Sequence, residues 1–307
     1  MKKRNSGATS PINHLCDEIL VGIFMLLNVA DIAAVSLVCK SWNRVCREPS
    51  LWRKLDLTSL GSPYFYIPNT REALRDKRSS TRVTQFLKYV LSLSNGNTSC
   101  IVFNYYIYLT DVHLISAAER TQNLKRLILP ITGSLTRRGI NAAMRCWRGL
   151  ESITLTSMVK HNFLFPAIGK YCRNITEVKF TCGFLENHAD ALVKYTPNLR
   201  ILSIRYVIVS MKGLCTVLNS LQRLEMVNIC HSVIMDKPHP RSEVSVYGIG
   251  DLRSHLDISC MRKLIFCQGR RCLRCRNGHE DNNSPSRQPY GHFEDIWRED
   301  EIITLAH

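Results

Sequence analysis

A short apolar pattern that recurs along most of this chain limits the folds available to it. The pattern is apolar-x-x-apolar-x-apolar, and its middle apolar residue falls at positions 101, 127, 153, 178, 202 and 224. Looser copies centre on Leu55, which we expect to lie in an entry strand, and on Leu264. The intervals between the six positions fall from 26 to 22 residues. This spacing is typical of repeats in which one strand is followed by one helix.

Stretches with helical spacing of apolar residues lie between these strands. They are residues 84–93, 111–120, 138–147, 163–171, 188–195 and 211–219. A single strand-and-helix unit cannot bury its own apolar face, so we expect neighbouring units to stack around one continuous core. We therefore predict an α/β solenoid over residues 96–270, an arc of about six to eight repeats with the strands on its concave side.

A doubly wound α/β domain is the alternative, because it also alternates strands and helices. That architecture does not require one strand formula at a near-constant period. No glycine-rich phosphate-binding loop follows any of the predicted strands. The sequence therefore favours the solenoid.

The pattern is interrupted once, since 40 residues separate Leu224 from Leu264. Two prolines and two glycines fall within residues 231–251. We predict a loop insertion there, either functional or simply tolerated. Around the array we expect a flexible N-terminus at 1–10, a linker and first helical repeat region at 58–95, and a C-terminal cap and tail at 271–307.

Residues 15–57 have a different character, because they carry more apolar surface than so short a unit can bury. Two adjacent helical faces are apolar, one with Ile19 and Ile23 and the other with Leu20 and Phe24. Asn28 is the expected N-cap of a second helix. A unit of three short helices that is apolar on nearly all sides indicates a protein partner.

Three motifs of this unit resemble the F-box family. Residues 15–20 (LCDEIL) are similar to the family's Leu-Pro-x-Glu-Ile-Leu start, 36–42 (SLVCKSW) to its central helix and 49–52 (PSLW) to its end. Cys16 replaces the usual proline, which loses a preset N-terminal turn. The resemblance implies a three-helix F-box at 11–57. The docking residues it implies are Leu15, Ile19, Leu20, Ile23, Phe24, Leu27, Val38, Trp42 and Trp52.

Taken with the repeats, the chain resembles plant-type F-box proteins with leucine-rich repeats. The resemblance implies a non-catalytic substrate-recognition subunit of an SCF-type cullin–RING ubiquitin ligase. The F-box would bind a Skp-type adaptor, and through it cullin and RING subunits. We expect no enzymatic activity, because no serine, histidine and acid set stands in a recognisable catalytic frame.

The net charge of +16 indicates an acidic partner. Residues between the fixed apolar positions of the strands are expected on the concave surface, and six of them are basic: Lys125, Arg126, Lys179, Arg200, Arg205 and Arg223. We expect them to bind an acidic or phosphorylated protein segment. The alternatives are a basic scaffold for nucleic acid, although no aromatic stacking platform is interleaved with the basic residues, and a protein that docks the adaptor without directing ubiquitin transfer.

The thirteen cysteines are odd in number and scattered, which favours reduced thiols and a location in the nucleus and/or cytoplasm. No stretch reaches the roughly 18 to 20 apolar residues of a membrane span, so no membrane association is expected. Cys267, Cys272, Cys275 and His279 are a candidate zinc site, with free thiols as the alternative. We expect no other cofactor.

Overall fold

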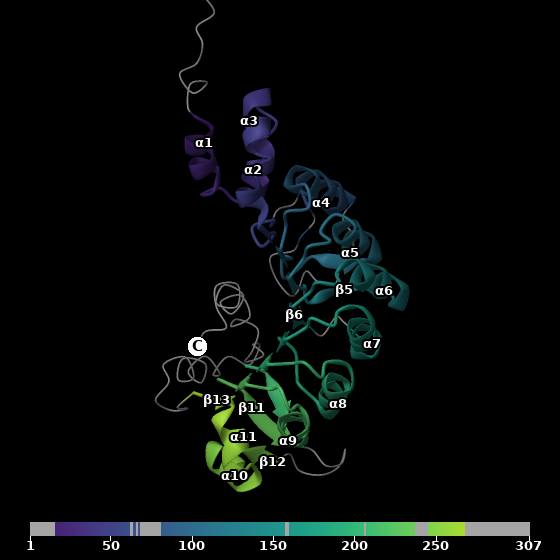
Figure 1. Cartoon of the computed structure of the whole chain (residues 1–307), viewed down its shortest axis with the longest axis vertical. Coiled ribbons are helices and arrows are strands. Elements are labelled where there is room, and N and C mark those ends of the chain that lie inside the picture. The colour runs from purple at the N-terminus through teal and green to yellow at the C-terminus, as the bar shows by residue number, and fades with distance from the viewer. Residues whose placement is uncertain are drawn as a thin grey trace, which may run out of the picture.

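The computed structural model describes residues 16–61, 64–65, 67, 81–156, 160–205, 207–236 and 245–267. These residues form an arc, with the N-terminal helices at one end and the last strands at the other (Figure 1). Buried apolar side chains from the first helix to the last strand belong to one continuous core. None of the described helices is long and apolar enough to span a bilayer.

An eight-stranded parallel sheet runs through the arc. Its strands are β1 (Lys54–Asp56), β2 (Cys100–Val102), β4 (Arg126–Ile128), β6 (Ser152–Leu155), β7 (Glu177–Phe180), β8 (Ile201–Ser203), β10 (Met226–Asn228) and β13 (Leu264–Ile265). Their order in the sheet is their order in the chain. A doubly wound sheet reverses its strand order at a switch point, and this sheet does not. The predicted α/β class with a parallel sheet is confirmed, and Leu55 lies in the entry strand.

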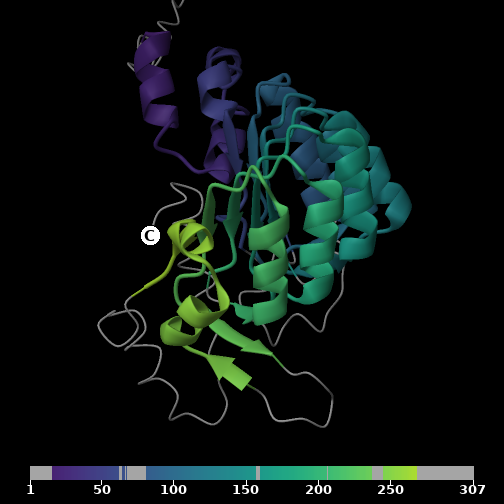
Figure 2. The same ribbon diagram turned by 60° about the horizontal axis from the view of Figure 1, so that its bottom comes forward.

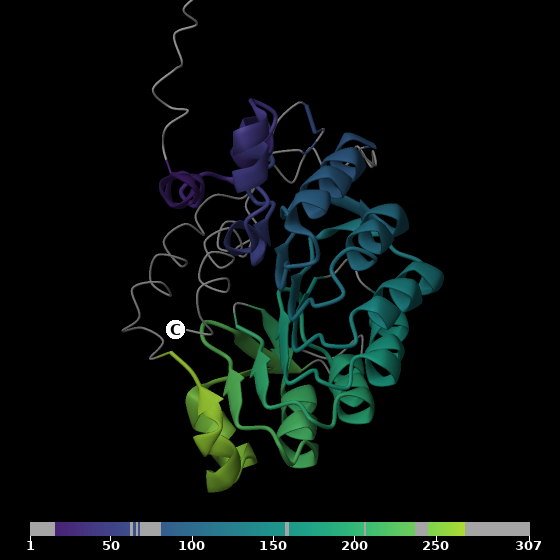
Figure 3. The same ribbon diagram turned by 45° about the horizontal axis from the view of Figure 1, so that its top comes forward.

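Six helices cover the convex side of the sheet (Figure 3). They are α4 (Thr81–Ser94), α5 (Asp111–Ala118), α6 (Arg137–Cys146), α7 (His161–Tyr171), α8 (Glu186–Tyr195) and α9 (Met211–Ser220). Each begins and ends within three residues of its predicted range. Consecutive helices pack against each other, which is how the units bury their apolar faces.

The strand register corrects the position predicted for the sixth copy of the apolar pattern. Val227 pairs with Leu202, and Leu202 pairs with Val178. All three are fully buried. The sixth copy is therefore Leu224, Val227 and Ile229, three residues later than predicted, and its interval from Leu202 is 25 residues. The alternative pattern starting at Leu221 was equally apolar, so periodicity alone did not separate the two.

Part of the segment predicted as a loop insertion is regular structure. A small sheet joins β9 (Ile208–Ser210), β11 (Val233–Asp236) and β12 (Ser245–Tyr247), with β11 parallel to β9 and antiparallel to β12 (Figure 2). Ile234 is buried in this sheet, which packs on α9. Helices α10 (Ile249–His255) and α11 (Ile258–Arg262) then lead to β13. A two-stranded sheet of β3 (Tyr108–Thr110) and β5 (Thr132–Ser134) lies nearer the N-terminal end.

Three short helices precede the sheet: α1 (Asp17–Phe24), α2 (Val29–Val35) and α3 (Lys40–Val45), followed by a 3₁₀ turn, η2 (Pro49–Trp52). The predicted N-cap is confirmed, because the Asn28 side chain accepts hydrogen bonds from the backbone N–H groups of Ala30 and Asp31. A 2.6 Å hydrogen bond between the hydroxyls of Ser36 and Tyr89 joins this unit to α4. The helices are thus seated on the first repeat.

Candidate functional site

A cluster of exposed apolar side chains on the N-terminal helices is the main candidate site. Among the described residues, twelve large apolar side chains are exposed, and six of these lie within residues 19–38. This apolar patch consists of Ile19, Ile23, Met25, Leu26, Leu37 and Val38. Leu26 is 87% exposed and Leu37 72% exposed. So many exposed apolar side chains within one short segment indicate a surface that a partner covers.

Helix α1 presents apolar residues to two sides. Leu20 and Phe24, four residues apart, point into the core and are nearly inaccessible. Ile19 and Ile23, also four residues apart, point outward and are about half exposed. The buried face of α1 therefore holds the unit together, and its exposed face remains available to a partner.

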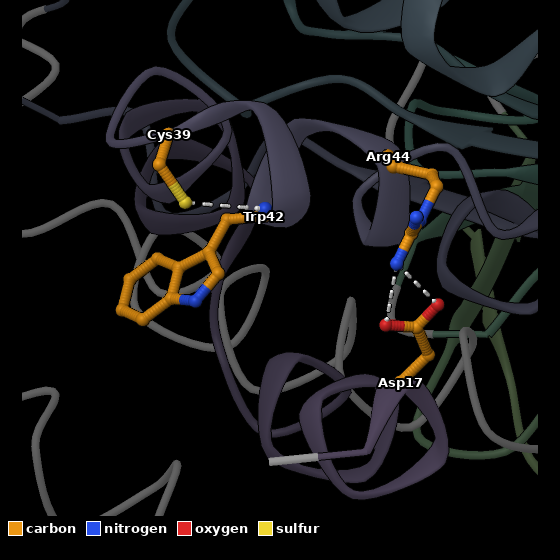
Figure 4. Close-up of polar contacts among 4 residues, drawn as sticks. All are labelled: Asp17, Cys39, Trp42 and Arg44. Atoms are coloured by element: carbon orange, nitrogen blue, oxygen red, sulfur yellow. Dashed lines mark hydrogen bonds and ion pairs between the residues drawn. The ribbon is translucent and has the colours of Figure 1, made fainter. Parts of the chain in front are cut away.

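Contacts between α1 and α3 hold this arrangement (Figure 4). Nη2 of Arg44 donates to both carboxylate oxygens of Asp17 at 2.9 and 3.1 Å. Both side chains are more than half exposed, so this ion pair orients the helices more than it stabilises them. Phe24 and Trp42 form an edge-to-face pair with ring centroids 5.6 Å apart. The Sγ atom of Cys39 accepts the backbone N–H of Trp42 and caps α3.

The structure divides the predicted docking residues into two groups. Ile19, Ile23 and Val38 belong to the apolar patch, while Leu27 and Trp42 are half-buried beside the core. Leu20, Phe24 and Trp52 are buried within the chain itself, which leaves little of their surface for a partner. The indole Nε1 of Trp52 donates to the carbonyl of Cys46 at 2.7 Å. Leu15 lies outside the described residues.

Met25, Leu26 and Leu37 are not among the docking residues that the resemblance implies. Met25 and Leu26 follow the end of α1, and Leu37 follows the end of α2. The combination of a short turn with consecutive apolar residues was the signal available in the sequence.

A groove adjoins the apolar patch where the N-terminal helices meet the sheet. Its volume is about 490 Å³, and it is lined by patch residues Met25 and Leu26 and by Lys54 and Asp56 of β1. Nζ of Lys54 lies 2.9 Å from the carboxylate of Asp56. Burial raises the pKa of Asp56, but hydrogen bonds from Thr58 and Lys54 outweigh that effect and lower it overall. The groove is thus lined by apolar side chains and by the ion pair of Lys54 and Asp56.

The basic residues predicted to face a substrate are largely paired with acids. Lys125 contacts Glu151 at 2.6 Å, and Arg200 forms a two-point pair with Glu225 at 2.7 and 2.9 Å. Each pair joins equivalent positions of successive repeats, one period apart. Arg223 donates to the side-chain carbonyl of Asn198. These contacts, which sequence spacing alone does not reveal, lie at the starts of the strands.

Three predicted substrate residues lie on the concave face itself. Arg126 and Lys179 share the carboxylate of Glu177, at 3.2 and 3.4 Å. Lys179 is only 1% exposed and Arg205 5% exposed. Two of the six predicted substrate residues, Lys179 and Arg205, are thus buried, and substrate binding by the six stays a prediction.

The candidate zinc site cannot be assembled from the described residues. Cys272, Cys275 and His279 lie outside them, and Cys267 is half-buried. Within the described part of the chain, no group of three or more potential metal ligands comes together.

Burial raises the pKa of the thiols of Cys46 and Cys182, which are not part of that candidate site, to about 11, so these two thiols remain protonated at neutral pH.

Comparison with known proteins defines the class and then the family. A model of the F-box-like family matches residues 12–58. An F-box/LRR-repeat protein of Arabidopsis thaliana is 30% identical over 292 residues, covering 94% of this chain and 94% of the relative. Two other Arabidopsis thaliana proteins match at lower identity. A putative F-box protein is 24% identical over 98% of this chain and 97% of the relative, and F-box protein SKIP1 is 26% identical over 75% and 82%.

The apolar patch lies on the segment that the F-box-like model matches, so the protein is of the F-box class. More narrowly, the chain belongs to the family of F-box proteins with leucine-rich repeats.

Proposed function

We propose that this chain is the substrate-recognition subunit of an SCF-type cullin–RING ubiquitin ligase, and that the apolar patch binds a Skp-type adaptor. The observation that carries the proposal is the gathering of Ile19, Ile23, Met25, Leu26, Leu37 and Val38 on the outer surface of the F-box. Cullin and RING subunits would be recruited through the adaptor.

The energetics of the patch suit such a role. Fully burying a leucine or valine side chain stabilises a complex by about 1.5–3 kcal/mol. Leu26, Leu37 and Val38 are the most exposed members, so they have the most surface to lose on binding. A few central apolar anchors usually dominate the affinity of an interface. The buried Leu20, Phe24 and Trp52 hold the anchors in place without touching the partner.

The repeats are proposed to form a leucine-rich-repeat solenoid that recruits the substrate. The parallel sheet in chain order and the covering helices support this interpretation. The chain itself would perform no chemistry. It would hold a substrate lysine near the ubiquitin-carrying enzyme, which raises the effective concentration of the two reacting groups.

A binding assay with purified Skp-type adaptor tests the docking surface. Leu26→Asp with Val38→Asp should weaken adaptor binding by about 100-fold or more, because two apolar anchors are replaced by charges. The matched control is Val112→Asp with Val246→Asp, at valines that are 58% and 63% exposed on other parts of the chain. The control variant should bind as the unaltered chain does. Binding by the patch variant within about twofold of the unaltered chain would contradict the proposal.

A further inference from the structure

Five basic residues gather on the edge of the arc where the helices end and the chain turns back toward the sheet. Arg145, Lys170 and Lys194 belong to the last turns of α6, α7 and α8. Each stands seven residues before one of the positions that pair across β6, β7 and β8, so the three are equivalent. Arg148 and Arg173 are equivalent in the same way, three residues further along the first two of these repeats. We call the five residues the basic edge.

The basic edge is an exposed strip of defined length. All five of its residues are exposed. Helices α6, α7 and α8 pack against one another in sequence along the arc (Figure 1). Packed helices lie about 8–10 Å apart, so the strip is roughly 20 Å long. It stops at both sides, because the equivalent positions of the neighbouring repeats hold Glu119 and Asn219.

The basic edge differs from other basic positions of the repeats because it lacks acidic partners. Elsewhere a cation of one repeat pairs with an acid of the next, as Lys125 does with Glu151 and Arg200 with Glu225. No carboxylate of the described residues forms an ion pair with any of the five edge residues. The stretches that carry the edge contain no aspartate or glutamate: residues 145–149, 170–174 and 194–198. Positive charge therefore accumulates on this strip without compensation from its surroundings.

The helix dipole does not account for this accumulation. A cation in the last turn of a helix is favourable, because the C-terminal end of a helix carries partial negative charge. Arg148 and Arg173, however, lie beyond the ends of α6 and α7. Helices α5 and α9 end without any basic residue in the last turn. Stacking of the repeats therefore does not require the basic edge, and a ligand explains it better.

The aromatic residues of this strip favour a protein ligand over nucleic acid. The ammonium groups of Lys170 and Lys194 lie over the rings of Tyr171 and Tyr195, 5.1 and 5.2 Å from the ring centres. The Tyr195 ring also lies against Gly169 of α7. Proteins that bind single-stranded nucleic acid offer open aromatic faces on which bases stack, and these two rings are already partly covered. Carboxylates of a protein segment need only the cations.

We propose that the basic edge binds an acidic segment of a protein partner, extended across the C-terminal ends of α6, α7 and α8. An extended chain rises about 3.3 Å per residue, so about six residues span the roughly 20 Å between the outer helices. The two arginines can each hold a carboxylate at two points, which fixes its orientation. The basic edge shares no residue with the apolar patch. The proposal therefore goes beyond the proposed function and does not depend on it.

Fluorescence anisotropy with a labelled hexaglutamate peptide tests the proposal on the full chain. The edge variant reverses one exposed cation in each of the three repeats: Arg148→Glu, Lys170→Glu and Lys194→Glu. The matched control reverses three exposed cations elsewhere, with the same change of net charge: Lys88→Glu, Arg138→Glu and Lys160→Glu. Two of the control positions lie at the opposite ends of α6 and α7. A neutral edge variant has glutamine at the same three edge positions, in case the reversed charges prevent folding.

The unaltered chain should bind hexaglutamate at low salt, and more weakly as salt is raised. The edge variant should bind it about tenfold more weakly or worse, while the control variant stays within about twofold of the unaltered chain. The neutral edge variant should fall between the two. Failure of the unaltered chain to bind the peptide would overturn the proposal. Equal losses in the edge and control variants would do the same, because they would show that only net charge matters.

Two further probes define the length and the class of the ligand. Triglutamate reaches only about half of the strip, so it should bind about fivefold more weakly than hexaglutamate. Equal affinity of the two peptides would indicate a local site and contradict binding across three repeats. A single-stranded oligouridylate with six phosphates should bind more weakly than hexaglutamate. Tighter binding of the oligonucleotide, lost in the edge variant, would overturn the assignment to a protein segment.

These measurements separate the basic edge from the adaptor surface. No step uses the adaptor, and all the edge substitutions lie on the repeats. Failure of the peptide to bind therefore leaves adaptor binding untouched, and loss of adaptor binding leaves the peptide measurements valid.

Discussion

Gly139 of α6 lies directly against the carboxylate of Asp111, the first residue of the preceding helix, so that a side-chain carbon at position 139 would overlap it. That carboxylate accepts two hydrogen bonds from Thr136, one from its backbone N–H at 2.9 Å and one from its hydroxyl. Thr136 in turn caps α6 through its hydroxyl, which accepts the N–H of Gly139. The glycine therefore permits one repeat to anchor the start of the next.

We expect Gly139→Ala to destabilise the protein by about 1–3 kcal/mol, because the Asp111 carboxylate must move away from Thr136. Urea unfolding followed by circular dichroism measures the effect. Gly22→Ala is the matched control, since Gly22 also lies in a helix but has open space around it. The control should stabilise the helix by about 0.5–1 kcal/mol. Equal effects of the two substitutions would contradict the role assigned to Asp111.

Thr121→Val should cost about 1–3 kcal/mol, because it leaves a buried indole N–H unsatisfied. Nε1 of Trp147 donates to the Thr121 hydroxyl at 3.0 Å, and both residues are fully buried. The same hydroxyl donates to the carbonyl of Ala117. A double-mutant cycle with Trp147→Phe is the test: the two losses should be less than additive, since the second change removes the donor. Additive losses would show that the two side chains do not interact.

Stability should fall between pH 6.5 and pH 4 through His188. Burial, together with the neighbouring charge of His161, lowers the pKa of His188 from 6.5 to about 4. In that range the unfolded chain binds a proton that the folded chain does not, so stability is fully present above pH 6.5 and is lost as the pH falls. The Nδ1 atom of His188 accepts the backbone N–H of Leu185, which protonation would prevent. Urea midpoints at pH 7.5 and 5 should differ less for His188→Gln than for the unaltered chain. His161→Gln should give an intermediate difference.

Two glutamates of the sheet should respond very differently to neutralisation. Glu177→Gln removes the carboxylate that Arg126 and buried Lys179 share, and breaking a buried pair costs about 3–5 kcal/mol. Glu225→Gln breaks the exposed pair with Arg200 and should produce no measurable change in unfolding. Thermal unfolding of both variants makes the comparison. A larger effect at Glu225 than at Glu177 would refute this ranking.

The sequence predicted the alternating strands and helices of the parallel sheet because every strand has to meet the same requirement. The same core position must be apolar in every strand, and Ile101, Leu127 and Ile153 all satisfy it. The helix ends were also predicted within a few residues, because apolar residues at helical spacing mark each helix. The position of the sixth copy was predicted wrongly because patterns starting at Leu221 and at Leu224 are equally apolar. The pairing of Val227 with Leu202 decides between them.

The site was predicted less completely, because burial depends on which neighbours a side chain meets. In α1, Ile19 and Leu20 are chemically alike, yet packing against the core exposes one and buries the other. Charges on the sheet posed a similar problem. Lys125 and Glu151 are 26 residues apart in the chain and adjacent in space, a relation that becomes visible once the repeat register is known. The second sheet of β9, β11 and β12 was missed because its strands are short and partly exposed.

Because the strands follow one another in the sheet as they do in the chain, each strand of the described sheet pairs only with its neighbours, and this sheet does not itself join the two ends of the described array. Such an array can unfold progressively from one end, so its unfolding need not be all-or-none. Of the tryptophans in the described part of the chain, Trp42, Trp52 and Trp147 all lie in its N-terminal half. In a Trp297→Phe variant, intrinsic fluorescence will therefore record the melting of that half, while hydrogen exchange at β10 and β13 is needed to see the distal end fray.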